Sequence, residues 1–246
     1  MATEQVLVTE KRGPVEWVIL NRPDAGNALD AELVGALVGY FESLRDRDEV
    51  RVVVLRARGR HFCVGADLSG AAFAENARSP HNIWALQRRI ARSYVAMRKC
   101  PQPIISLVQG AACGGGFSLA LASDIRIAGE TAKMNAAYIK IGLTGCDMGS
   151  SYFLPRLVGT SVASELLLTG RFIHAPRALA VNLVSEVVAD GELEFAAQSY
   201  VEDMILTSPM GLRLTKDALN FSVDAASLEA AMAIEDRHQS LLALTG

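Results

Sequence analysis

Two glycine-bearing loops are the segments whose residue types and spacing best support chemistry. Residues 114–116 are three consecutive glycines, between an apolar run at 104–108 and a helix-like stretch from Phe117. A buried strand that turns through glycines into a helix leaves free N–H groups at the positive end of that helix. Because glycine has no side chain, those donors can closely approach a ligand oxygen.

The second loop, residues 63–68, follows a strand-like run at 52–55. Two strand-end loops that offer N–H groups to one point would form an oxyanion hole, a pair of donors that stabilises negative charge on a carbonyl oxygen. The alternative is that both loops are tight turns that need small residues only for packing, since glycine-rich turns alone are a weak motif.

The elements that must position these loops alternate between strands and helices. Strand patterns occur at residues 6–9, 15–20, 51–57, 104–108 and 124–128, and the first two form a predicted hairpin. This order predicts an α/β core with parallel crossovers. After about Ser151 helices dominate, and the predicted ones are 161–168, 176–183, 193–206, 211–220 and 228–242.

Two helices lie between the early strands. Asp30 is the predicted N-cap of the first, whose apolar stripe consists of Leu33, Leu37, Tyr40, Phe41 and Leu44. The second is expected at residues 82–98 and ends before Pro101. Its face with Trp84, Leu86, Ile90 and Tyr94 is interpreted as core.

Composition excludes several classes of function. Half of the 246 residues are apolar, which suffices for one large core, and the net charge of −3 gives no electrostatic case for nucleic acid or a membrane surface. The four cysteines are widely spaced without a C-x-x-C pair, which favours a reducing, cytoplasmic setting over a metal or disulfide framework. The N-terminus shows no secretory pattern, and no apolar run approaches the length of a membrane helix.

A series of motifs runs in order along the chain. They are NRP at 21–23, NAL at 27–29, RHFCVGADL at 60–68, GAACGGG at 110–116, SDIRIA at 123–128, LPRLVG at 154–159, ELLLTG at 165–170, SP at 208–209 and TK at 215–216. Each is weak singly, but their joint order and spacing are specific. The chain resembles the crotonase superfamily, the enoyl-CoA hydratases and isomerases.

The resemblance implies a fold, a ligand and an assembly. It implies an α/β protein with a crotonase-type ββα spiral core, residues 1–190, and a C-terminal helical region, residues 191–246, that is not an independent domain and builds homotrimers or hexamers. It implies an acyl-CoA thioester as ligand, with coenzyme A entering as part of the substrate and no separate cofactor. The N–H groups of Ala66 and Gly115 would hold the thioester carbonyl oxygen and stabilise an enolate-like state.

Two positions depart from the hydratases of this family. The resemblance places Ser118 and Tyr138 where those enzymes carry catalytic glutamates. A serine hydroxyl needs a partner base, and a tyrosine with an ordinary pKa near 10 is a poor base at neutral pH. A positioned acid or base contributes about 10²–10⁴ in rate, so the sequence predicts poor hydration of an ordinary enoyl-CoA.

The resemblance implies a catalytic role for one acidic residue, Asp147. Asp147 matches the catalytic aspartate of dienoyl-CoA isomerases and the nucleophile of 4-chlorobenzoyl-CoA dehalogenases, although nothing here selects a haloaromatic. The alternative is that Asp147 caps the helix expected from Ser150.

The remaining expected site residues surround the ligand. Gly65, Asp67 and Leu68 belong to the first loop, where Asp67 could instead only fix the loop geometry. Arg22 and Lys216 match places near the nucleotide of coenzyme A, with exposed, solubilising charge as the alternative. The histidines at 61, 81, 174 and 238 are interpreted as surface or capping residues.

The sequence therefore predicts an enoyl-CoA hydratase- or isomerase-type enzyme that polarises a thioester through Ala66 and Gly115, with Asp147 and Tyr138 as the candidates for proton movement. Two alternatives remain open: a non-catalytic acyl-CoA-binding protein, and a dienoyl-CoA isomerase-like enzyme that uses Asp147.

Overall fold

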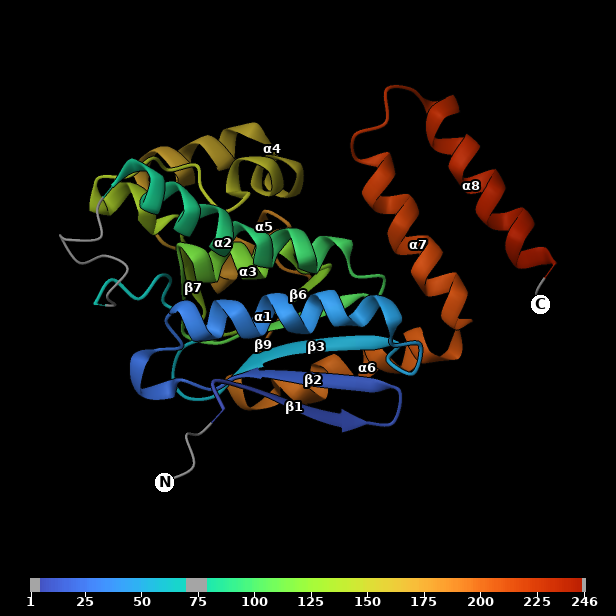
Figure 1. Cartoon of the computed structure of the whole chain (residues 1–246), viewed down its shortest axis with the longest axis horizontal. Helices are drawn as coiled ribbons and strands as arrows, with labels where there is room; N and C mark the ends of the chain where they lie inside the picture. Colours follow the sequence, from blue (N-terminus) through green and yellow to red (C-terminus); the bar gives the residue numbers. More distant parts are fainter. Residues whose placement is uncertain (1–4, 70–78, 245–246) are drawn as a thin grey trace.

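A six-stranded sheet forms the centre of the molecule (Figure 1). The computed structural model describes residues 5–69 and 79–244. The strand order is β1-β2-β3-β4-β6-β9, in which β1 pairs antiparallel with β2 and all other neighbours are parallel. The strands are β1 (Leu7–Arg12), β2 (Val15–Leu20), β3 (Val52–Ala57), β4 (Ile104–Val108), β6 (Ile125–Gly129) and β9 (Glu186–Val188). The five predicted strands and the parallel crossovers are confirmed, with ends shifted by up to three residues.

A second, three-stranded sheet carries the approach to the glycine trio. It has the order β5-β7-β8, from β5 (Ala111–Cys113), β7 (Lys133–Asn135) and β8 (Ile173–His174). The sequence did not predict these strands or β9, because two or three residues are too short to display an alternating pattern.

Helices cover both faces of the large sheet (Figure 1). Val53 and Leu55 of β3 face the core beneath α1 (Ala31–Ser43), α2 (Pro80–Lys99), α3 (Gly115–Ala122) and α4 (Ser150–Thr169). Val52 and Val54 point to the other face, where α6 (Leu193–Leu206) packs on them. This division follows from the twofold alternation of side chains along a strand.

The helix signals in the sequence were reliable. Asp30 caps α1 by accepting a 2.8 Å hydrogen bond from Leu33 N–H, and the predicted stripe of α1 is buried. The helices expected at 150–157 and 161–168 join as α4, with Gly159 at φ +74° marking a break between them. The helix expected at 176–183 is α5 (Ala175–Ala180). The interpretation of Trp84 as core is wrong: it lies on the outward side of α2 and is 59% exposed.

Two C-terminal helices, α7 (Pro209–Ser222) and α8 (Leu228–Ala243), project from the rest of the molecule (Figure 1). They pack on one another, and α8 buries no residue completely. By contrast, α6 lies against the large sheet although it belongs to the predicted C-terminal region. The division of the chain at residue 190 stays a prediction.

Candidate functional site

The two predicted loops lie side by side. Cys63 forms a parallel bridge with Ala112: its N–H donates to Ala111 O at 3.1 Å, and its O accepts from Cys113 N–H at 2.9 Å. A Cβ built on Gly65 would lie 2.9 Å from Cys113 O and 3.7 Å from Gly115 N. The peptide that joins Gly65 to Ala66 therefore runs against the start of α3, in a backbone conformation (φ +102° at Gly65) that favours glycine.

The N–H groups of Ala66 and Gly115 remain available for a ligand. Ala66 bridges Leu29, but the bridge bonds use Gly65 O and Asp67 N–H. Neither the Ala66 nor the Gly115 N–H has an acceptor within residues 5–69 and 79–244. Gly115 is also the first residue of α3, where the helix dipole favours negative charge.

Glycine is required at the start of α3 by close packing. A Cβ on Gly115 would meet Leu29 Cδ1 at 2.7 Å and the Tyr94 hydroxyl at 2.9 Å, and a Cβ on Gly116 would lie 2.0 Å from Cys63 O. The alternative interpretation, that these loops need small residues for packing, is therefore partly correct. Packing brings the first loop against α3, and this contact is what sets the two free N–H groups near each other.

A buried pair of hydroxyls lies behind the glycines. Ser118 on α3 and Tyr138 on the short 3-10 helix Ala137–Ile141 are joined by a 2.7 Å hydrogen bond between their hydroxyl oxygens. The Tyr138 ring packs on Gly114, where a Cβ would lie 3.3 Å from Cε1. Burial raises the pKa of Tyr138, the Ser118 hydrogen bond opposes this, and the charge of Asp147 adds to the rise. Tyr138 is therefore a neutral hydroxyl at neutral pH.

Asp147 is half-buried and does not cap α4, whose N-cap is Gly149. Its Oδ1 accepts from Met148 N–H at 2.7 Å and from the Gln87 side chain of α2. Burial raises the pKa of Asp147, while these two hydrogen bonds lower it. The next residue, Met148, has an uncommon positive φ of +49°. The N-cap alternative is therefore wrong, and the carboxylate lies near the buried hydroxyls.

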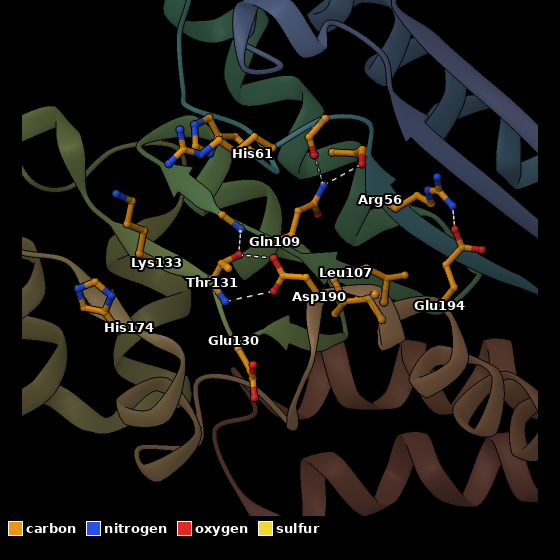
Figure 2. Close-up of a pocket in the computed structure, with 16 residues that line it drawn as sticks. Arg56, His61, Leu107, Gln109, Glu130, Thr131, Lys133, His174, Asp190 and Glu194 are labelled. Carbon is orange, nitrogen blue, oxygen red and sulfur yellow. Dashed lines mark hydrogen bonds and ion pairs between the residues drawn. The ribbon is translucent and has the colours of Figure 1, made fainter.

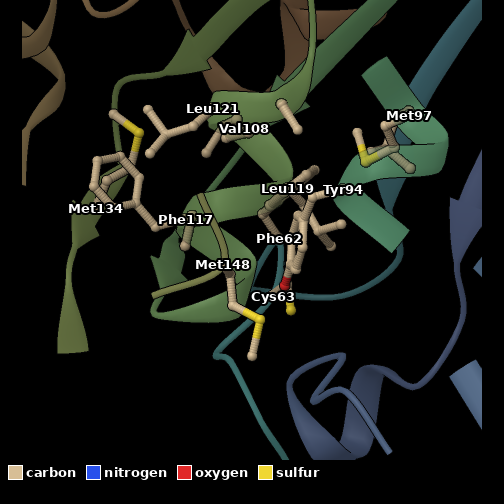
Figure 3. Close-up of a cluster of buried hydrophobic side chains, with 14 of the residues drawn as sticks. Phe62, Cys63, Tyr94, Met97, Val108, Phe117, Leu119, Leu121, Met134 and Met148 are labelled. Atoms are coloured by element: carbon tan, nitrogen blue, oxygen red, sulfur yellow. The ribbon is translucent and has the colours of Figure 1, made fainter. Parts of the chain in front are cut away.

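Tyr94 on α2 lies between the start of α3 and Asp147. Its hydroxyl donates to Gly115 O at 3.0 Å, and the Asp147 charge contributes to the upward shift of its pKa, of which burial is the largest cause. In Figure 3 Tyr94 lies beside Cys63, with Met148 close by. Tyr94 and Met148 also line a cavity of about 560 Å³ between α2, α4 and α7. The sequence missed Tyr94 as a site residue, since its spacing on α2 marks it only as core.

Comparison with protein families matches residues 10–243 to the family described as enoyl-CoA hydratase/isomerase. The chain belongs to this family. It is 38% identical over 242 residues to the probable enoyl-CoA hydratase EchA12 of Mycobacterium tuberculosis, covering 97% of this chain and 85% of the relative.

Solved structures of this family share the fold. A probable enoyl-CoA hydratase/isomerase from Mycobacterium abscessus matches with a TM-score of 0.89 at 34% identity, over 97% of this chain and 90% of that one. A monofunctional enoyl-CoA isomerase from Mycobacterium smegmatis matches with a TM-score of 0.78 at 36% identity, over 93% and 99%. The predictions of the crotonase fold and of an enzyme of this family, which acts on acyl-CoA thioesters, are confirmed.

Arg22 is half-buried rather than an exposed charge. It pairs with Asp30 and Asp67, each at 3.1 Å, and donates to Ala28 O. Asp67 also accepts from Ser69 N–H and Oγ. The Ser69 and Arg22 hydrogen bonds lower the pKa of Asp67, so its charge is kept in this network. Arg22 and Asp67 thus brace the loop that carries Ala66, and Leu68 follows it with an exposed side chain.

Lys216 is held inside the protein, although it contributes to the lining of the cavity between α2, α4 and α7. It is 4% exposed, and its Nζ lies 2.9 Å from Asp124 Oδ2 and donates to Gln102 O at 2.7 Å and Met97 O at 3.3 Å. All three N–H groups are thus used inside the protein. This geometry contradicts the alternative of an exposed, solubilising charge, because Lys216 is buried and anchors α7. Its contact with the nucleotide of coenzyme A stays a prediction.

Over the described ranges, no three histidine, cysteine or acidic side chains gather as a metal site would need. In the same part of the chain, no helix has the length and hydrophobicity to cross a bilayer.

Proposed function

We propose that this enzyme moves a double bond within an enoyl-CoA, and that Asp147 carries the proton. The observation that supports this most directly is the pattern of ionisable groups. The Asp147 carboxylate acts electrostatically on Tyr94, whose hydroxyl donates to Gly115 O, and on Tyr138. Ser118 and Tyr138, which the resemblance aligns with the glutamates of hydratases, form a neutral hydroxyl pair. Moving a double bond requires one base that removes a proton and returns it elsewhere, whereas hydration also requires an activated water.

In the proposed reaction the thioester oxygen accepts hydrogen bonds from Ala66 and Gly115 N–H. In a 3-enoyl-CoA, Asp147 removes a proton from the carbon between the thioester carbonyl and the double bond, and the electron pair shifts onto the thioester oxygen as a dienolate. The protonated Asp147 then gives the same proton to another carbon, the carbonyl reforms and the double bond has moved. Atoms and charge balance without a cofactor, and coenzyme A enters with the substrate.

The acyl chain would occupy the cavity between α2, α4 and α7. Its wall near the site is apolar, with Tyr94 and Met148 next to Phe153 and Ala91. Gly65 and Leu68 would contact the thioester end from the first loop. Ser118 and Tyr138 would close the bottom of the site as a neutral surface, and Arg22 with Asp67 would hold the loop in place.

Comparing substrates tests this proposal. We expect purified protein to convert a 3-enoyl-CoA into its 2-enoyl isomer, followed by ultraviolet absorbance, at least about a hundredfold faster than it hydrates crotonyl-CoA, since hydration lacks a second positioned group. Faster hydration than isomerisation would refute the isomerase assignment. Micromolar binding of thioesters without turnover of any of them would instead favour a non-catalytic acyl-CoA-binding protein.

The assembly and location are proposed on separate grounds. The projecting α7 and α8 expose large apolar side chains, among them Leu219, Phe221, Leu228 and Met232, which supports a homotrimer or hexamer built through these helices. Sedimentation equilibrium should give a mass of three or six chains, and a monomer would refute this.

The four cysteines are all unpaired, which supports a cytoplasmic location.

A further inference from the structure

A polar cavity of about 770 Å³ lies at the carboxyl ends of β3, β4 and β6 (Figure 2). It shares no lining residue with the thioester site. Ligands of open parallel sheets bind at this edge of the strands. Its volume is within the range of small-molecule sites, and its walls are unusually rich in charged side chains.

One end of the polar cavity is positively charged. Arg60 and His61 line it from the loop after β3 and Lys133 lines it from β7, and no carboxylate within residues 5–69 and 79–244 forms an ion pair with Arg60 or Lys133. Instead, Lys133 Nζ lies 5.1 Å from the centre of the Phe172 ring, a contact that holds the ammonium without using its N–H donors. Two cations thus face the same space without a counter-charge.

The acidic residues of the polar cavity do not neutralise that end. Asp190 accepts from Thr131 N–H at 3.1 Å and from its hydroxyl, and Glu194 pairs with Arg56 and Arg12. Figure 2 shows Glu130 pointing away from His61 and Lys133. Glu194 is therefore neutralised by arginines, whereas Asp190 and Glu130 keep their charge but form no ion pair with Arg60 or Lys133.

His61 adds a neutral donor. Its Nδ1 accepts from Ala111 N–H at 3.2 Å, so the neutral imidazole must carry its proton on Nε2. Burial lowers the pKa of His61, and repulsion by Arg60 and Lys133 lowers it further. Both cations thus favour the neutral form of the ring.

We propose that the polar cavity binds a phosphate-bearing small molecule through Arg60, His61 and Lys133, at a site separate from the thioester site. A phosphate would supply the missing counter-charge, with the guanidinium of Arg60 able to donate two parallel hydrogen bonds. The inference does not depend on the proposed isomerase activity.

Calorimetry with inorganic pyrophosphate and with ADP tests this. We expect one site per chain, and about tenfold weaker binding in each of Arg60→Gln and Lys133→Gln, because each removes one charge-assisted contact. Lys11→Gln is the matched control, since it removes an exposed lysine of β1 that lies outside the cavity. No binding to the unaltered protein, or equal affinities in all variants, would overturn the proposal.

A competition experiment distinguishes a free phosphorylated ligand from the phosphates of coenzyme A itself. ADP binding is measured again with the protein saturated by acetoacetyl-CoA, and we expect the ADP affinity to be unchanged. Loss of ADP binding would overturn a separate site. Because Arg60 is exposed and Lys133 is half-buried, circular dichroism and retained acetoacetyl-CoA binding show whether each variant is folded.

Discussion

The hydroxyls of Ser118 and Tyr138 lie 2.7 Å apart, both buried, at the positions that the resemblance aligns with the glutamates of hydratases. The serine–tyrosine pair instead satisfies its own hydrogen bond and contributes no charge. Within residues 5–69 and 79–244, Asp147 is the carboxylate near Tyr94 and Tyr138 that is left to move a proton.

Asp147→Asn should lower isomerase turnover by about 10²–10⁴ while acetoacetyl-CoA binding is kept, because the variant retains the shape and hydrogen-bond acceptor of the side chain but cannot take a proton. Rates and binding are measured by ultraviolet absorbance and calorimetry. Asp203→Asn, an exposed change on α6, is the control and should be neutral. Unchanged turnover in Asp147→Asn would remove this residue from the mechanism.

Gln87→Leu should move the acid limb of kcat/KM to higher pH. The reaction needs ionised Asp147, whose pKa burial already raises above that of an exposed aspartate, and the Gln87 hydrogen bond opposes this rise. Without that hydrogen bond the carboxylate is harder to ionise. Gln198→Leu, on the exposed side of α6, should leave the profile unchanged. An acid limb that stays in place or moves to lower pH would contradict the assignment.

Gly115→Ala should reduce turnover severely, because the added Cβ would press on Leu29 and the Tyr94 hydroxyl beside the site. Loss of one oxyanion donor typically lowers kcat by about 10²–10³. The matched control is Gly35→Ala on α1, where a Cβ meets nothing within 4 Å. That change should stabilise the protein by about 0.5–1 kcal/mol in urea unfolding. Full activity of Gly115→Ala would show that the start of α3 is not part of the site.

Ser118→Ala should destabilise the protein by about 1–3 kcal/mol, since it leaves the buried Tyr138 hydroxyl without its partner. The double variant Ser118→Ala/Tyr138→Phe should recover much of this loss, because both polar groups are then removed. Urea unfolding of the single and double variants forms a double-mutant cycle. Strictly additive losses would mean that the two hydroxyls do not interact.

Lys216→Met should destabilise the protein by about 3 kcal/mol, because it removes the buried ammonium that anchors α7 to the half-buried Asp124. Lys99→Met, an exposed lysine at the end of α2, should change stability by less than about 0.5 kcal/mol. Urea unfolding at neutral pH measures both. Equal, small effects would mean that Lys216 is not the anchor.

The same ion pair makes stability depend on pH. Burial would raise the pKa of Asp124, but Lys216 and Arg98 outweigh it and hold the pKa below its ordinary value. A depressed folded-state pKa gives stability above about pH 4 that is lost as the pH falls further. Asp124→Asn should therefore be less stable at neutral pH and lose less on acidification. A parallel loss in both proteins would exclude this linkage.

The sequence predicted the backbone parts of the site better than its side-chain contacts. Glycine spacing and strand ends identify the loops of Ala66 and Gly115, because turns and free N–H groups follow from local chain geometry. Gln87 was missed, since it lies sixty residues before Asp147 and no motif marks it. The burial of Lys216 was missed because its partner, Asp124, is distant in sequence and becomes a neighbour only when α7 packs.

The central claim is that Ala66 and Gly115 N–H hold one thioester oxygen. A crystal structure with acetoacetyl-CoA measures it most directly. We predict the thioester oxygen at about 2.7–3.1 Å from both nitrogens, with the Asp147 carboxylate facing the acyl carbons. A thioester oxygen beyond hydrogen-bond reach of either nitrogen would contradict the account.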